Sequence, residues 1–388
     1  MIYLDNAATT QIEPKVLEEM MPYLTDQFGN PGTLYSLGRR ARDAIEKARE
    51  QVANLIGAEP DQIIFTSGGT EGNNMVFSMM SQYMRQRGKN HIAVSSIEHD
   101  SVLKAAQKLA DNHGFEVTQI PVNHTGCIEL ETMQRELKRN TGFVSIMHTN
   151  NEISVINSVR DLAKIAHNAG ALFHTDCVQT LGSEPIDVRR IDCDFATISA
   201  HKIHGPKGVG AVYIKDKRLF GPMICGGYGQ EFGIRGGTEN VAGIVGFGKA
   251  CELIYESDRM KALKYIDDLK NAFSSRLFLA LLDYGLEDDL KINGAHSQYG
   301  TNVMNFRVDG IDAESLILML DNSGVCISAG SACNSQEQVP SHVLKAIGLS
   351  DDQARQSFRV SFSRMNKLPE VENAGCIVAE CISALKGL

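Results

Sequence analysis

Several features that would assign the chain to other classes of protein are missing from its sequence. No apolar stretch is long enough to span a bilayer, so we expect no membrane segment. There is no long run of Lys and Arg, and the formal net charge is −9, which argues against direct nucleic-acid binding because phosphate recognition needs a clustered basic surface. The first residues, MIYLD, lack the basic and apolar regions of a secretory signal, and we therefore expect a cytoplasmic protein.

The nine cysteines also lack a pattern. They are odd in number, scattered and without a C-x-x-C pair, so we expect reduced thiols rather than disulfides, and no resident metal. No internal repeat or low-complexity segment is visible. A chain of 388 residues can bury a large core, and this length predicts two domains.

Short apolar runs alternate with amphipathic helical patterns over the first half of the chain. The runs cover residues 63–65, 91–95, 116–120, 143–147, 171–173 and 195–198. Such alternation predicts an α/β fold with a mainly parallel sheet covered by helices on both faces. Ligands of such sheets bind beyond the carboxyl ends of the strands. The residues that follow these ends, and that we expect to converge on one crevice, are Gly69, His99, Asn151, Asp176 and Lys202.

Two of these residues suggest a cofactor. Lys202 lies between the apolar run that ends at Ile198 and a Gly-Pro turn, and Asp176 closes the run that ends at Phe173. Most lysines at strand ends are simply solvated. A lysine and an aspartate at neighbouring strand ends, however, are what pyridoxal phosphate requires, because the lysine forms a Schiff base and the carboxylate keeps the pyridinium nitrogen protonated. We therefore predict this cofactor.

The turn at residues 66–71, TSGGTE, lies between a predicted strand and a helix predicted from Asn73 to Met84. Its Gly and Thr residues would leave N–H groups and a hydroxyl at a helix N-terminus, which suits a phosphate group. A plain helix N-cap explains the same residues equally well. The turn alone leaves both interpretations open.

Two cysteines differ in their surroundings. Cys326 lies between Val325 and Ile327, and we expect it in the interior. Cys333 lies in a segment rich in Gly, Ser, Asn and Gln, which is typical of a mobile loop and unusual for a cysteine. It is either a spare surface thiol or a reactive one.

Motifs spread over nearly the whole chain resemble those of one enzyme family. They are YLDNAATT at 3–10, FGNP at 28–31, FTSGGTEGNN at 65–74, EH at 98–99, MHTNNE at 147–152, HTDCVQ at 174–179, SAHKIHGPKG at 199–208, RGGTEN at 235–240 and SAGSAC at 328–333. On these motifs the chain resembles the cysteine desulfurases of the NifS/IscS type, which are class V members of the fold-type I pyridoxal-phosphate-dependent transferases. The resemblance implies a large cofactor-binding domain over residues 15–257, and a smaller α+β domain formed by residues 1–14 and 258–388.

The resemblance also implies roles for individual residues. Lys202 would carry the cofactor covalently, Asp176 would pair with its ring nitrogen, and His99 would lie on the ring and transfer protons. Cys333 would be the nucleophile that takes the sulfur, and it could transiently ligate an iron–sulfur cluster during transfer. Asn151 and Gln179 would contact the ring oxygen of the cofactor, and Arg359 and Asn30 would bind the substrate. The phosphate would be bound by Gly69, Thr70, Ser199 and His201. Thr238 would reach the phosphate in the partner subunit.

An enzyme of this kind would convert L-cysteine to L-alanine as a homodimer. The sulfur would pass as a persulfide to an acceptor protein of iron–sulfur cluster assembly, tRNA thiolation or DNA phosphorothioation. Two alternatives remain: another pyridoxal-phosphate enzyme of this fold, such as an aminotransferase or selenocysteine lyase, and an inactive scaffold that binds sulfur acceptors. The sequence departs from the family's usual motifs at Tyr35, Ser154, Tyr228, Phe232 and Cys326.

Overall fold

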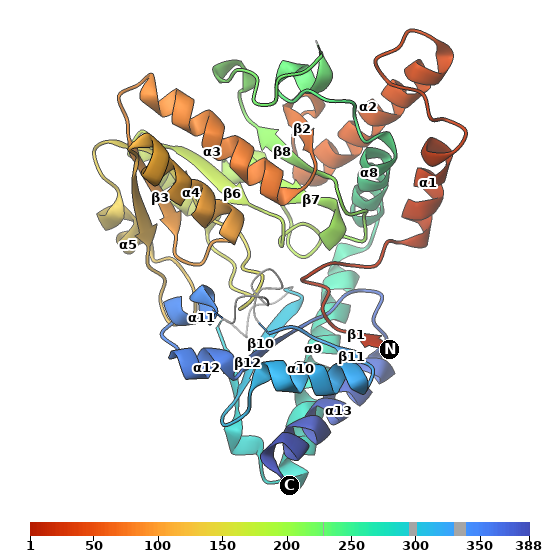
Figure 1. Cartoon of the computed structure of the whole chain (residues 1–388), viewed down its shortest axis with the longest axis vertical. Helices are drawn as coiled ribbons and strands as arrows, with labels where there is room; N and C mark the ends of the chain where they lie inside the picture. Colours follow the sequence, from red (N-terminus) through yellow and green to blue (C-terminus); the bar gives the residue numbers. More distant parts are fainter. Residues whose placement is uncertain (228, 295–300, 330–338) are drawn as a thin grey trace.

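The computed structural model describes residues 1–227, 229–294, 301–329 and 339–388, and one large sheet forms its centre (Figure 1). The seven strands lie in the order β2-β8-β7-β6-β5-β3-β4. Neighbouring strands are parallel, except that β8 runs antiparallel to both β2 and β7. The strands are β2 (Ile63–Thr66), β3 (His91–Ser95), β4 (Glu116–Ile120), β5 (Thr141–Ser145), β6 (Leu172–Asp176), β7 (Phe195–Ser199) and β8 (Gly210–Ile214). This arrangement confirms the predicted α/β fold with a mainly parallel sheet.

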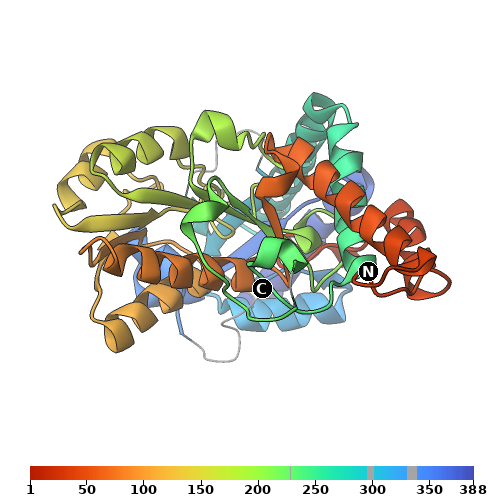
Figure 2. The same cartoon turned by 90° about the horizontal axis from the view of Figure 1, so that it is seen from above.

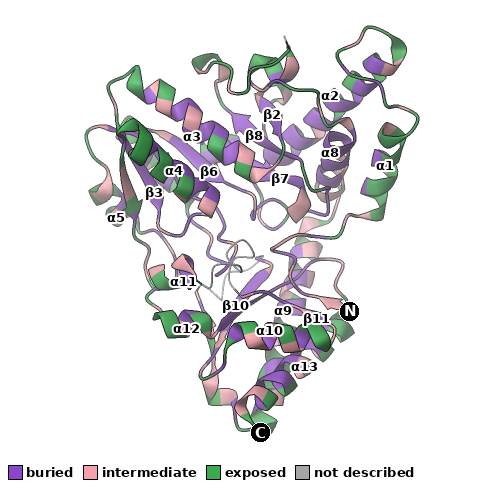
Figure 3. Cartoon of the chain, viewed as in Figure 1, coloured by how far each residue is buried: buried purple, intermediate pink, exposed green. Residues whose placement is uncertain are grey.

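Helices cover both faces of this sheet, as the view from above shows (Figure 2). Successive strand residues point to opposite faces, so Ile64 joins a core with the helices of one face and Phe65 joins a core with those of the other. Figure 3 shows the strands buried between the two helical layers. One layer contains α3 (Gly69–Arg85) and α4 (Asp100–His113), and the other contains α1 (Pro14–Leu24), α2 (Ser36–Ile56), α5 (Leu130–Glu136), α6 (Val159–Asn168) and α8 (Val241–Tyr255).

The remaining elements form a second body, drawn below the large sheet in Figure 1. An antiparallel sheet in the order β12-β10-β9 and a parallel pair of β1 and β11 belong to it. Their apolar side chains form a separate core, which Leu4 joins from the N-terminus. On this basis we propose the domain division at residues 15–257 against 1–14 and 258–388. The elements are β1 (Ile2–Tyr3), α9 (Arg259–Asp283), β9 (Leu290–Asn293), β10 (Val303–Val308), α10 (Ala313–Asn322), β11 (Val325–Cys326), α11 (His342–Ala346), α12 (Asp351–Arg355), β12 (Ser357–Ser361) and α13 (Leu368–Lys386).

The structure contains elements that the sequence patterns above do not include. Strand β8 inserts antiparallel into the large sheet, and α13 packs on α9. Helix α8 contains several glycines, which lower helix propensity, but they allow close approach to α2: a Cβ at Gly248 would lie 2.6 Å from the Cα of Ala48. Helix α3 begins at Gly69 rather than at Asn73. No helix of the described residues is both long and apolar enough for a membrane crossing.

Candidate active site

An open cavity of about 810 Å³ lies beyond the carboxyl ends of the parallel strands. The parallel topology explains its position, because loops from several strand ends meet there. The structure therefore brings together most of the residues that the sequence predicts. The cavity is lined by Ala7, Ala8, Gly69, Thr70, Asn73, His99, Ser101, Met147, Asn151, Asp176, Val178, Gln179, His201, Lys202 and Arg359.

Lys202 occupies a short 3₁₀ turn, Ala200–Lys202, directly after β7. Its Nζ donates to the carbonyl of Ala8 at 3.0 Å, and also to the carbonyl of Ala7. The same N-terminal segment also binds this turn, because the Thr10 hydroxyl donates to the carbonyl of His201 at 2.9 Å. The first ten residues thus complete the wall of the cavity around the lysine amine.

Asp176 and His99 are joined by a chain of hydrogen bonds. Asn73 Nδ2 donates to Asp176 Oδ2 and to Ser101 Oγ, each at 2.8 Å. Ser101 Oγ lies 2.8 Å from His99 Nδ1, which also accepts from the Ser101 backbone N–H at 3.1 Å. Because His99 Nδ1 accepts, the neutral ring carries its proton on Nε2. Asp176 Oδ1 accepts from the backbone N–H of Val178 at 2.9 Å, so this carboxylate is held at both oxygens.

A hollow that adjoins the cavity has the features of an anion site. Helix α3 begins there at Gly69, and no side chain caps its first turn. Ser199 Oγ is buried and has no partner among the described residues. Burial, together with the positive charges of Lys202 and Lys207, lowers the pKa of His201 to about 4, so this ring is neutral at pH 7. N–H groups of a helix start, a hydroxyl and a neutral imidazole can together bind a phosphate group.

Arg359 reaches the cavity from β12, and its side chain is only 1% exposed. Its NH2 group donates to Asp5 Oδ1 at 2.8 Å, and its NH1 group donates to the carbonyl of Asn151 at 3.0 Å. Its Nε has no partner within the described part of the chain. A buried guanidinium with an N–H group to spare is suited to binding a substrate carboxylate.

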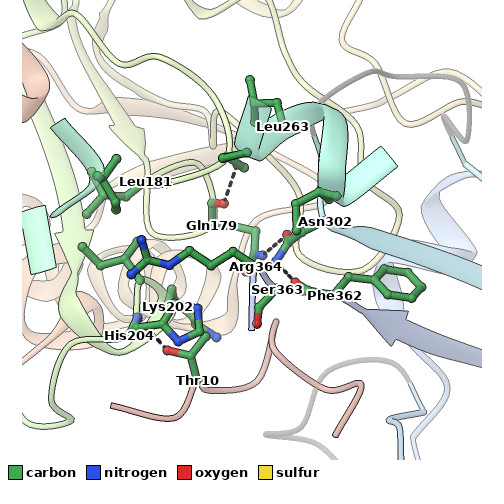
Figure 4. A pocket seen from close by; sticks show the side chains of 16 residues that line it. Thr10, Gln179, Leu181, Lys202, His204, Leu263, Asn302, Phe362, Ser363 and Arg364 are labelled. Carbon is green, nitrogen blue, oxygen red and sulfur yellow. Dashed lines mark hydrogen bonds between the residues drawn. The ribbon is translucent and has the colours of Figure 1, made fainter. Parts of the chain in front are cut away.

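A second cavity of about 640 Å³ adjoins the first, since both are lined by Lys202 and Gln179 (Figure 4). His204, Asn302 and Arg364 also line it. Gln179 Nε2 donates to Asn302 Oδ1 at 3.1 Å. The contact of Gln179 with a cofactor ring oxygen stays a prediction.

Two predicted site residues lie away from this cavity within the single chain. Asn30 is in an exposed loop, where its side chain accepts from the backbone N–H of Gly32 at 2.8 Å. Thr238 is exposed in the glycine-rich loop at residues 226–240. Their predicted contacts therefore stay predictions.

The glycine-rich loop is tied firmly to the large body. Arg49 of α2 donates to both carboxylate oxygens of Glu231, at 2.8 and 2.9 Å, and both side chains are nearly fully buried. Arg235 forms a second ion pair, with Glu71 in the first turn of α3, at 2.9 Å. The two ion pairs hold Glu231 and Arg235, which precede Thr238 in the loop.

The structure explains two of the departures from the family's motifs. Ser154 has a φ of +65°, a left-handed conformation that favours glycine, and its hydroxyl donates to the carbonyl of Val303 and can accept from the Thr301 hydroxyl. Phe232 also has a positive φ, of +56°, and its ring lies 5.0 Å from the Arg49 guanidinium carbon. Tyr35 is exposed before α2, and nothing in the structure explains it.

The structure describes only one of the two cysteines considered above. Cys326 lies beside Tyr3 in the β1–β11 pair and is half-buried rather than interior, because this pair lies at an edge of the molecule. Burial, with the negative charges of Asp321 and Asp5, raises the pKa of its thiol and disfavours the thiolate. Cys333 and its predicted mobile loop lie outside the described residues, as does Tyr228.

The sequence patterns missed several residues of the site. Asn73 and Ser101 connect Asp176 to His99, and Asp5 pairs with Arg359. Asn73 could have been found, because it lies four residues after Gly69 and so on the same side of α3. Asp5 gives no local signal, since its partner is 354 residues away.

The groups around the cavity fit pyridoxal phosphate. Ser199 Oγ and Arg359 Nε are buried without partners among the described residues, whereas buried polar atoms are normally hydrogen-bonded. The lysine amine and the Asp176 carboxylate lie on the same cavity. This set offers partners for an aldehyde, a pyridinium nitrogen and a phosphate.

Known proteins resemble this chain over its length. Residues 2–374 match the family model described as Aminotransferase class-V. A cysteine desulfurase IscS from Dictyoglomus turgidum is 44% identical over 359 residues, which are 92% of this chain and 88% of the relative. A solved NifS-like protein matches with a TM-score of 0.89 and 34% identity, over 99% of this chain and all of the other. A solved SspA in complex with cysteine matches with a TM-score of 0.78 and 31% identity, over 95% of this chain and all of the other. The chain therefore belongs to the class V aminotransferase family of pyridoxal-phosphate enzymes.

Proposed function

We propose that this chain is a cysteine desulfurase, a sulfurtransferase that converts L-cysteine to L-alanine and passes the sulfur on as a Cys333 persulfide. The main observation is that Lys202, Asp176 and Arg359 line one cavity, so that groups for the cofactor and for an amino-acid carboxylate lie together. The relatives support the substrate, because one is named a cysteine desulfurase and another was solved in complex with cysteine.

The residues that would hold pyridoxal phosphate divide by the part of the cofactor that they suit. Lys202 would supply the amine for covalent attachment, and Asp176 would pair with the ring nitrogen. Thr70, Ser199 and His201, with the N-terminus of α3, would bind the phosphate. When bound, the cofactor supplies an electron sink that makes the α-carbon of the substrate acidic.

The remaining cavity residues would bind the substrate and move protons. Arg359 would bind the α-carboxylate, since it is fixed by Asp5 and by the Asn151 carbonyl but keeps its Nε free among the described residues. His99 holds a proton at Nε2 while Nδ1 is committed to Ser101, so it can exchange a proton at a fixed ring position.

Sulfur transfer would use Cys333 as the nucleophile. Its thiolate forms an S–S bond with the substrate sulfur while the substrate C–S bond breaks. The carbon keeps the electron pair of that bond and takes up a proton, which gives alanine, and the substrate sulfur remains on Cys333 as a persulfide. A second thiol of an acceptor protein can then take this sulfur.

The proposed enzyme is a homodimer in which Thr238 reaches the site of the second copy. The exposed position of Thr238, on a loop tied down by ion pairs, supports this arrangement. Exposed apolar side chains near one end of the molecule also favour association: Leu24, Phe28, Leu34 and Tyr35 are all exposed. Burying side chains of this kind contributes roughly 1.5–3 kcal/mol each.

The acceptor and the compartment are further parts of the proposal. A persulfide requires a thiol-bearing acceptor protein, which would belong to iron–sulfur cluster assembly, tRNA thiolation or DNA phosphorothioation. None of the described cysteines forms a disulfide, which suits the reducing cytoplasm. Neither a membrane nor direct nucleic-acid binding is part of the proposed function.

The test is to incubate the purified, cofactor-loaded protein with L-cysteine and a reductant, and to quantify alanine and sulfide. Equal amounts of both are expected from the natural protein, and neither from Cys333→Ser. Cys326→Ser is the matched control and should retain both products. Transfer of the amino group to a keto acid without sulfide release would show an aminotransferase instead. A protein that binds no pyridoxal phosphate would be a scaffold.

A further inference from the structure

Asn302 lines the second cavity, where it contacts Gln179 of the other body of the chain (Figure 4). Its Oδ1 accepts from Gln179 Nε2 at 3.1 Å, and its Nδ2 donates to the carbonyl of Phe362 at 3.0 Å. Gln179 follows β6 in the large body, whereas Asn302 precedes β10 and Phe362 follows β12 in the other. Asn302 thus connects a side chain of the cofactor cavity to the strand that carries Arg359.

These two hydrogen bonds determine which way both amides point. A backbone carbonyl can only accept, so the group of Asn302 that faces Phe362 has to be its NH2. Its oxygen therefore faces Gln179, and the group of Gln179 that meets it has to be the NH2 as well. The Phe362 carbonyl therefore sets the orientation of the Asn302 amide, and Asn302 in turn sets the orientation of the Gln179 amide.

This orientation matters because the Gln179 side chain lines the cavity with Lys202 and Asp176. Gln179 Oε1 is buried, and within the described part of the chain it has no partner that would hold the amide. Without Asn302, the amide could turn by 180° and exchange its donor for its acceptor. An anionic ring oxygen is attracted by the NH2 group and repelled by the carbonyl oxygen.

We propose that Asn302 is a positioning residue, which fixes the Gln179 amide so that its NH2 group is the one available to pyridoxal phosphate. This inference rests on the proposed function insofar as the protein binds this cofactor and Gln179 contacts its ring oxygen. It requires no cysteine chemistry, so binding and spectra test it separately from desulfuration.

The experiment is a double-mutant cycle with Asn302→Ala, Gln179→Ala and the double variant. For each protein the dissociation constant for pyridoxal phosphate is measured by titration of the cofactor-free form, and the wavelength of the visible absorption band is recorded for the loaded form. Asn302→Ala should bind the cofactor about fivefold to tenfold more weakly and shift the band, because it releases one hydrogen bond to the ring oxygen. In the Gln179→Ala background the same change should have no further effect on either quantity.

Two more variants separate positioning from a general loss of structure. Asn305→Ala removes a buried amide from β10, the strand that follows Asn302; this amide contacts Asn293 and does not line the cavity, so the substitution should leave the band unshifted. Asn302→Leu keeps roughly the size but removes both the acceptor for Gln179 and the donor to Phe362, so it should reproduce the band shift if Asn302→Ala does not fold. The proposal is overturned if either Asn302 substitution, made in the natural protein, changes neither the dissociation constant nor the absorption band. It is also overturned if the substitution has the same effect in the natural protein and in Gln179→Ala. If the natural protein binds no pyridoxal phosphate, this inference and the proposed function fail together. If the protein desulfurates cysteine but the effects of the two substitutions simply add, only this inference is overturned.

Discussion

Glu98 gives the sharpest prediction for the pH dependence of stability. It precedes His99 and is completely buried. Its Oε1 accepts from the backbone N–H of Met147 at 2.6 Å and from the Ser95 hydroxyl, while its Oε2 has no partner among the described residues. Burial, with a smaller contribution from the Asp176 charge, raises the pKa of Glu98 from 4.5 to about 8.

The sign and the size of the effect follow from this shift. Well below pH 4.5 the Glu98 carboxyl is protonated in both the folded and the unfolded chain, so its burial as a charged group does not lower the free energy of unfolding. Above that pH the unfolded chain loses the proton first, so stability falls as pH rises and the loss is complete above about pH 8. A shift of about 3.5 units corresponds to roughly 5 kcal/mol in total, of which about 3 kcal/mol is lost between pH 6 and pH 9.

The assay is urea unfolding of the cofactor-free protein at pH 6, 7, 8 and 9, with Glu98→Gln beside the natural protein. Gln keeps the shape and an acceptor oxygen for Met147 but does not ionise. The variant should therefore gain about 3 kcal/mol in the free energy of unfolding, relative to the natural protein, between pH 6 and pH 9. Glu50→Gln, which removes an exposed carboxylate, is the control and should show no such gain. A difference between Glu98→Gln and the natural protein that is the same at all four pH values would refute the reasoning.

Four further predictions test other parts of the structure. Arg49→Met should lower the free energy of unfolding by about 3–5 kcal/mol, because Glu231 is left charged and buried, and adding Glu231→Gln should restore a large part; no recovery in the double variant would contradict this. Lys202→Ala should leave no cofactor covalently attached after borohydride reduction, and mass spectrometry that finds the adduct on another lysine would show this assignment to be wrong. Arg359→Lys should raise KM for cysteine about tenfold or more through loss of the planar fork, and an unchanged KM would exclude it from carboxylate binding. Cys326→Ser should retain turnover, and a persulfide found on Cys326 after one turnover of the natural protein would point to a relay between thiols.

The sequence by itself determined the parallel strands of the large sheet and the strand ends that form the site. Strands β3, β6 and β7 contain short apolar runs and end in the polar residues Ser95, Asp176 and Ser199, and this pattern is local. Once the alternation of strands and helices implied a parallel sheet, the convergence of Asp176 and Lys202 followed from topology, because all parallel strands end at the same edge. The cofactor could be predicted for the same reason.

Only the tertiary structure decided which side chains hold these groups in place. The N-terminal segment brings Asp5 to Arg359 and the carbonyl of Ala8 to Lys202, across separations of 354 and 194 residues. The bond from Gln179 to Asn302 likewise crosses between the two bodies of the chain. No periodicity or spacing encodes such pairs, since each joins residues that are far apart in the chain and meet only in the folded structure. Local sequence patterns therefore predict the strand ends of the site but not the long-range contacts that hold its side chains in place.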